Sequence, residues 1–243
     1  MVKSVFPLAC AALCLFVAGT AEATNKCTAT SKKPLQLFSY DTAGIVWQNK
    51  RIDSPLDPNT QRLMVHVLDN SSPDEPYDYA GAIGPCTGIE KQALPNVRNL
   101  SYDFLNTSTH PVHNGAGAPR ISVEIDTDGD LKTTEVVAYL AGFYCEDPLA
   151  ENPAWSRADF TGRVTAGCAF YTSEPGSPSY ASDGSKSAWT VFAEAHPTWK
   201  VVQAYLVMDE DGTAFIDRLA FHNRMFQAPG NAGVKICGSE AAC

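Results

Sequence analysis

Residues 201–222, VVQAYLVMDEDGTAFIDRLAFH, contain two runs in which every second residue is apolar. Such alternation is typical of β-strands, because successive side chains of a strand point to opposite faces of its sheet. The pair Asp211-Gly212 stands between the runs and tolerates the positive φ of a tight hairpin turn. The stretch therefore predicts two central strands paired as a hairpin, with Phe215, Leu219 and Phe221 on one face of the second strand.

A second hairpin is predicted upstream. Alternation over residues 121–125 leads into an acidic segment, 126–130, and resumes over 136–140. Further short strands are predicted at 35–38, 44–48, 62–68, 98–104, 156–162 and 168–172. Stretches rich in Gly, Pro, Ser and Asp predict loops at 69–88, 107–119 and 173–187.

One helix is predicted over residues 187–196. Trp189, Phe192, Ala193 and His196 follow the i, i+3, i+4, i+7 spacing of a helix face, and Pro197 ends the helix. Many short strands with turn-rich loops and one short helix predict an all-β fold, an antiparallel β-sandwich.

The N-terminus has the pattern of an export signal. Lys3 precedes an apolar run over residues 5–18, and Ala21-Glu22-Ala23 fits the small-x-small cleavage rule. A membrane anchor is the alternative, but the run is shorter than the roughly 20 residues of a membrane-spanning helix. We therefore expect residues 1–23 to be removed and residues 24–243 to form a single secreted β-sandwich domain with a loosely structured N-terminal arm.

The cysteines agree with export to an oxidising compartment. Of the eight cysteines, Cys10 and Cys14 lie in the signal segment. An even number remains, which favours disulfides and leaves several pairings open. We predict that Cys145 pairs with Cys168, which is close in sequence, and that a bridge between Cys27 and Cys243 joins the two termini. The six cysteines expected to be oxidised are Cys27, Cys86, Cys145, Cys168, Cys237 and Cys243.

The charge of the chain argues against two classes of partner. The formal net charge is −9, the sequence pI is about 5.0, and the basic residues form no stripe. Nucleic acids and anionic membrane surfaces attract basic patches, so neither is an expected partner.

The segments LSYDF, GAPRISVEI, FYC, WSRADF, SAWTVFAEAHP and VVQAYLVMDEDGTAFIDRLAF resemble, in their succession, exported jelly-roll domains. These domains are similar to galactose-binding-like domains and carbohydrate-binding modules. The resemblance covers residues 97–223 and lies in the pattern of strands rather than in a binding motif. It implies a jelly-roll-like sandwich and glycan recognition.

The acidic segment predicts a cation site. Asp126, Asp128 and Asp130 offer clustered carboxylate oxygens, which are the ligands that Ca²⁺ prefers. The spacing is not that of an EF-hand loop, because glycine stands at the fourth place and the closing glutamate is absent. The alternative is an acidic turn favoured by turn chemistry and solvation alone.

Exposed aromatic side chains could stack on sugar rings. Trp155, which follows Pro153, and Tyr77 and Tyr79, in the acidic loop, are the predicted ligand-binding residues. Sequons for N-glycosylation occur at Asn70, Asn99 and Asn106.

Two hydrolase signatures, Gly-x-Ser-x-Gly and His-Glu-x-x-His, are absent from the sequence. The preferred interpretation is a non-catalytic exported protein that binds a glycan or another extracellular surface. Two alternatives remain open. One is a secreted carbohydrate-active hydrolase or lyase with dispersed carboxylates, and the other is a purely structural secreted interaction protein.

Overall fold

The computed structural model describes residues 33–40, 43–48, 62–67, 79–105, 119–145, 148–149, 152–162, 168–209, 212–226 and 234–236. Several predictions concern residues outside these ranges: the signal segment 1–23, Cys27, Cys237, Cys243, Tyr77, Asn70 and Asn106.

The described residues form two antiparallel sheets. The first, sheet A, has the order β1 (Gln36–Tyr40), β4 (Tyr79–Ile83), β12 (Lys200–Met208), β6 (Arg120–Asp126), β7 (Val136–Ala141), β10 (Ala169–Thr172) and β11 (Ser179–Ala181). Every neighbouring pair in it is antiparallel.

The second sheet, sheet B, has the order β15 (Val234–Ile236), β14 (Arg224–Phe226), β13 (Gly212–Phe221), β5 (Ser101–Leu105), β9 (Asn152–Asp159) and β8 (Pro148–Leu149). Two further strands join it, because β3 (Arg62–Val67) pairs with β13 and β2 (Gly44–Gln48) pairs with β3. Two short 3₁₀ turns are η1 (Leu94–Asn96) and η2 (Gly142–Cys145).

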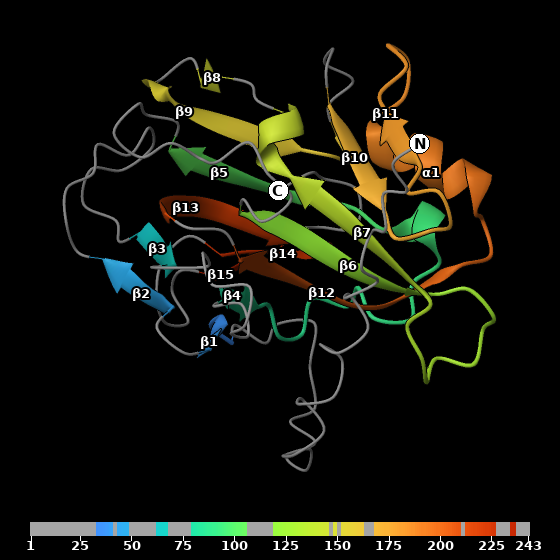
Figure 1. The fold of residues 1–243 in the computed structure, drawn as a ribbon, viewed down its shortest axis with the longest axis horizontal. Helices are drawn as coiled ribbons and strands as arrows, with labels where there is room; N and C mark the ends of the chain where they lie inside the picture. Colours follow the sequence, from blue (N-terminus) through green and yellow to red (C-terminus); the bar gives the residue numbers. More distant parts are fainter. Residues whose placement is uncertain are drawn as a thin grey trace, which may run out of the picture.

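A single core lies between the sheets. Ile121 and Val123 of sheet A and Tyr102 and Phe104 of sheet B belong to the same buried hydrophobic cluster. Figure 1 shows the two sets of strands, with helix α1 (Ala188–Ala195) beside β10 and β11 at one end. Within the described ranges α1 is the one α-helix. The predicted all-β antiparallel sandwich with one short helix is therefore confirmed.

The predicted hairpin over residues 201–222 is wrong. Both of its strands exist and both are central, but β12 pairs with β4 and β6 of sheet A, whereas β13 pairs with β3, β5 and β14 of sheet B. The chain passes from one sheet to the other between Asp209 and Gly212. The physical reason is that both edges of β12 are already paired, one with β4 and the other with β6, so no edge is left for β13.

Two bulges change which residues face the core. In β12 the register shifts between Val201 and Gln203, so Val201 joins Leu206 in the core although it stands five positions away. In β13 the register shifts between Asp217 and Ala220. The prediction that Phe215 shares a face with Leu219 and Phe221 is wrong for this reason. Phe215 packs instead in a second cluster with Leu105 and Trp155.

The predicted helix is confirmed. The Ser187 hydroxyl accepts a hydrogen bond from the backbone N–H of Thr190 at 3.2 Å, and His196 is the C-terminal cap. The indole N–H of Trp189 donates to the Leu94 carbonyl at 3.0 Å, which ties the helix to η1. Phe192 packs edge-on against Phe170 of β10.

The structure also contains strands within two predicted loops, β4 within 69–88 and β11 within 173–187. Strand β4, YAGAI, has small residues at its three central positions, which do not mark a strand. Its small residues are required by packing. A Cβ at Gly81 would lie 2.1 Å from the Leu206 carbonyl oxygen and 2.4 Å from the Phe38 ring.

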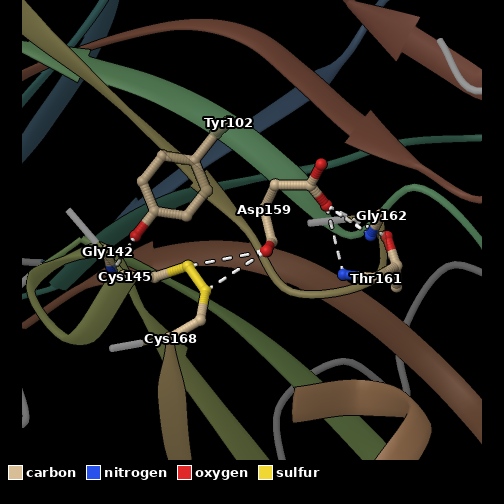
Figure 2. The surroundings of a disulfide bond; sticks show 7 residues. All are labelled: Tyr102, Gly142, Cys145, Asp159, Thr161, Gly162 and Cys168. Carbon is tan, nitrogen blue, oxygen red and sulfur yellow. Dashed lines mark hydrogen bonds between the residues drawn. A yellow bond between two sulfur atoms is a disulfide. The ribbon is translucent and has the colours of Figure 1, made fainter. Parts of the chain in front are cut away.

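A disulfide joins Cys145, at the end of η2, to Cys168, just before β10, as predicted (Figure 2). The Asp159 carbonyl oxygen lies 3.5 Å from the Cys145 sulfur and 3.2 Å from the Cys168 sulfur. The Asp159 carboxylate accepts hydrogen bonds from the backbone N–H groups of Thr161 and Gly162, which fixes the turn that follows β9. Cys86 is also disulfide-bonded.

The Tyr102 hydroxyl, buried near this disulfide, connects the two sheets. It donates to the Pro119 carbonyl and accepts from the Gly142 N–H, each at 2.5 Å (Figure 2 shows the second). Burial raises the pKa of Tyr102 above its ordinary value. In the part of the chain that the structure describes, no helix is both long and apolar enough to cross a membrane.

Replacing Leu206 with alanine should lower the free energy of unfolding by about 2–5 kcal/mol, because it removes a fully buried side chain. Lys132, whose side chain is exposed, provides the control, and Lys132→Ala should stay within ~0.5 kcal/mol of wild type. Urea unfolding followed by circular dichroism measures both. Equal stabilities of the two variants would contradict the position of β12 in the core.

Replacing both Cys145 and Cys168 with alanine should lower the free energy of unfolding by about 3 kcal/mol in the chain-entropy model. The bridge closes a loop with a sequence separation of 23, and its loss frees that loop in the unfolded state. Peptide mapping without reduction should recover the two cysteines in one linked fragment. Alkylation of either thiol in the native wild-type protein would refute the pairing.

Candidate functional site

The outer face of sheet A carries a group of aromatic side chains, here called the aromatic face. Tyr205, Ser122, Tyr139 and Tyr171 stand directly opposite one another across β12, β6, β7 and β10. Their neighbours Leu206, Ile121 and Leu140 point into the core, so the tyrosine row points away from it. The aromatic face consists of Phe38, Tyr40, Tyr79, Tyr139, Tyr171 and Tyr205, each at least partly exposed.

The rings form close pairs. Tyr40 and Tyr79 stack at 5.3 Å between centroids with their planes 4° apart, and Tyr40 is 43% exposed. Tyr139 and Tyr171 stack at 4.9 Å and 26°. Phe38 lies against Tyr205 at 6.2 Å in an edge-on arrangement. Stacked and edge-on pairs of this kind hold aromatic rings in fixed orientations.

A carboxylate lies among these rings. Glu124 of β6 accepts hydrogen bonds from the Gln203 amide at 2.8 Å, from the Tyr205 hydroxyl at 3.2 Å and from the Thr134 hydroxyl at 3.2 Å. Burial and the nearby Glu124 carboxylate raise the pKa of Tyr205 above its ordinary value. Tyr205 therefore stays a neutral hydrogen-bond donor throughout the physiological pH range.

Arg120 and Ser122 lie beneath the rings. The Arg120 guanidinium donates two hydrogen bonds of 2.6 Å to the Asp209 carboxylate and lies 5.4 Å from the Tyr139 ring centroid. Burial acts to lower the pKa of Arg120, but Asp209 outweighs it and the pKa is raised. The Ser122 hydroxyl is buried and makes no hydrogen bond within the described residues. The ion pair braces the face without adding net charge.

This arrangement suits a saccharide. A sugar ring presents C–H groups on its faces and hydroxyls around its edge, so it needs flat apolar surfaces beside a few fixed polar groups. The tyrosine rings supply the flat apolar surfaces, and the Glu124–Gln203 pair supplies the fixed polar groups. The remaining lone pairs of Glu124 are acceptors for ligand hydroxyls.

The outcome differs among the three predicted ligand-binding residues. Tyr79 does lie on the aromatic face, whereas Tyr77 is outside the described residues. The prediction that Trp155 is exposed is wrong, since its exposed fraction is 0%. Trp155 follows Pro153 not in a loop but in strand β9, and it packs with Leu105 and Phe215 on the outer side of sheet B.

Sequence reasoning missed Tyr139, Tyr171 and Tyr205 as site residues. The sequence did indicate the direction of Tyr205, because alternation in β12 points its side chain away from the face that carries Leu206. Strand order was needed to bring the three together, since residues from β12, β7 and β10 are far apart in the sequence.

The acidic segment between β6 and β7 forms a tight loop. One Asp126 oxygen accepts the N–H groups of Asp128 and Gly129, and the other accepts that of Leu131. Burial acts to raise the pKa of Asp126, but these N–H groups, that of Gly129 foremost, lower it below its ordinary value. Asp126 thereby organises the loop itself.

Asp126, Asp128 and Glu135 each place a carboxylate oxygen within 4.8 Å of the others. Asp130, a predicted ligand, is not part of this group, and its carboxylate accepts the Lys132 N–H at 2.7 Å. The predicted Ca²⁺ site therefore remains a proposal, with Glu135 in the place predicted for Asp130.

The sequon at Asn99 lies before β5 rather than within a strand. Its side-chain amide donates to the His222 carbonyl at 2.7 Å, and its φ is 49°. Glycosylation of Asn99 stays a prediction. Asn70 and Asn106 are outside the described residues.

Comparisons with known proteins add no relative. No protein-family model, no curated protein and no solved structure matches the chain.

Adding Ca²⁺ to chelated protein should raise its Tm, because an ion bound only by the folded state stabilises it, by ~2.7 kcal/mol at a hundredfold excess over Kd. Asp128→Asn and Glu135→Gln alter exposed carboxylates and should reduce the shift. Glu194→Gln, at an exposed carboxylate on α1, should leave it unchanged. Differential scanning fluorimetry provides the measurement, and no shift at millimolar Ca²⁺ would exclude the site.

Proposed function

We propose that this chain is a secreted, non-catalytic binding protein that recognises a glycan through the aromatic face of sheet A. The observation that carries the proposal is the row of partly exposed tyrosines, Tyr205, Tyr139 and Tyr171, beside the fixed carboxylate of Glu124. Stacked rings of this kind offer flat surfaces at a low cost in conformational entropy, because their orientation is already fixed.

Secretion is part of the proposal. The N-terminal export pattern and the even number of remaining cysteines favour it. The Cys145–Cys168 disulfide supports it, since such bonds persist in oxidising compartments and are rare in the cytosol.

The polar groups of the face favour binding over hydrolysis. Hydrolysis by an ordinary glycosidase mechanism needs two carboxylates, one of them protonated, on either side of the scissile bond. Of the described carboxylates around the tyrosine row, Asp209 is committed to Arg120 by two hydrogen bonds, and Glu124 accepts three. A carbohydrate-active enzyme and a purely structural secreted protein remain the competing functions.

A glycan array probed with the secreted protein should give binding to a defined set of saccharides. Incubation of each bound saccharide with the protein, followed by chromatography, should release no product. Product release would support a hydrolase or lyase instead. An array without any binding would favour the structural alternative.

Among saccharides that bind, Tyr139→Ala should weaken affinity by about 1–3 kcal/mol, a range taken from the stacking of bases on aromatic side chains. Tyr139→Phe keeps the ring and serves as the matched control, so it should bind nearly as well as wild type. Isothermal titration calorimetry measures both, with circular dichroism to verify the fold. Equal affinity of the alanine and phenylalanine variants would show that sugar does not stack at this ring.

A further inference from the structure

A buried carboxylate on the outer face of sheet B holds two arginines. Asp103, in the central strand β5, has an exposed fraction of 0%. Arg157 stands directly across from it on β9 and donates through Nε to Asp103 Oδ1 at 2.8 Å. Arg218 approaches from β13 on the other side and donates through Nε to Oδ2, with Nη2 against the same oxygen. One carboxylate thus orients both guanidinium groups.

Much of the donor capacity of these arginines is unused. A guanidinium carries five N–H donors in a planar fork. Among the described residues, Asp103 is the one side-chain partner of both arginines. Arg157 uses only its Nε–H group in this contact. Their side chains are 19% and 14% exposed, so each keeps part of its surface in contact with solvent.

The backbone of β13 is distorted at this point. Asp217 stands across from Asp103, and Ala220 stands across from Ser101. Over this distance β13 therefore contains one residue more than β5. Regular alternation would turn Arg218 toward the core, and the bulge keeps it on the outer face. Arg218 adopts a φ of 44°, a conformation that side chains of this size rarely take. Bulges of this kind redirect side chains and are common beside functional sites.

The charges define what kind of ligand fits. Asp217 is a second carboxylate here, and its Oδ1 accepts the backbone N–H of Arg218 at 2.8 Å. The two positive charges of the guanidinium groups equal the two negative charges of the carboxylates. A ligand must therefore be attracted by correctly oriented N–H donors rather than by net charge. Adjacent guanidinium forks match the oxygens of a planar or tetrahedral oxyanion.

We propose that Arg157 and Arg218, held by Asp103, form a binding site for a single oxyanion, a carboxylate, sulfate or phosphate group. Asp103 pre-orients both forks, so binding orders little of the protein. The site lies on the sheet opposite to the aromatic face and is independent of glycan recognition there.

Nitrogen-15 NMR of the arginine Nε–H groups in the full mature protein tests this site directly. Titration with sulfate, phosphate and acetate at constant ionic strength should shift the Arg157 and Arg218 signals in a saturable way. The anion with the lowest Kd identifies which kind of oxyanion the site prefers. Arg98, which is exposed, should show no saturable shift. Absence of saturation at Arg157 and Arg218, or an equal response at Arg98, would overturn the proposal.

Two substitutions separate the site from general charge effects. Arg157→Gln should weaken binding of the preferred anion by about tenfold, or ~1.4 kcal/mol. Arg98→Gln removes the same charge from an exposed position and should leave Kd unchanged. Arg157→Lys keeps a cation beside Asp103 but loses the fork, so its affinity should fall between those of Arg157→Gln and wild type. An Arg157→Gln or Arg157→Lys variant that is folded and binds as tightly as wild type would contradict the proposed site.

Discussion

The ion pair between Arg120 and Asp209 fixes the point at which the chain leaves sheet A for sheet B. Asp209 directly follows β12, and its carboxylate is gripped by two hydrogen bonds from the neighbouring strand β6. The strands β12 and β6 therefore stay in register, with Leu206 opposite Ile121, close to the end of β12. Because β13 then begins in the other sheet, the two longest strands of the described residues lie in opposite sheets instead of pairing.

This separation determines what each outer face carries. In sheet A, β12 lies between β4 and β6, and that order brings Tyr205 into line with Tyr139 and into contact with Glu124. In sheet B, β13 lies beside β5, and its bulge brings Arg218 to Asp103. Both candidate sites thus depend on strand order, and each combines residues that are distant in the sequence.

Alternation in the sequence was enough to place the longer strands, such as β6, β7, β12 and β13, because a half-buried strand must repeat with a period of two. It placed Leu219 and Phe221 on one face, and both are buried, while closeness in the chain identified the Cys145–Cys168 bridge. Partner strands could not be predicted in the same way. An Asp-Gly pair favours a local turn, but it does not determine whether the next strand joins the same sheet.

The remaining errors come from tertiary packing. Bulges moved Val201 into the core and Phe215 out of it, and neither bulge has a sequence signature. Trp155 was predicted to be exposed because Pro153 stands two residues before it, yet it is buried on the outer side of sheet B. Strand β4 escaped notice because Gly81 must be small to lie beneath Phe38, and small residues resemble a loop.

Cross-strand NOEs between backbone Hα protons test the separation of β12 and β13 most directly. The structure predicts NOEs from β12 to β6 and β4, and from β13 to β5 and β3, with none between β12 and β13. A ladder of Hα NOEs joining β12 to β13 would show a hairpin. It would contradict the strand order on which both outer faces depend.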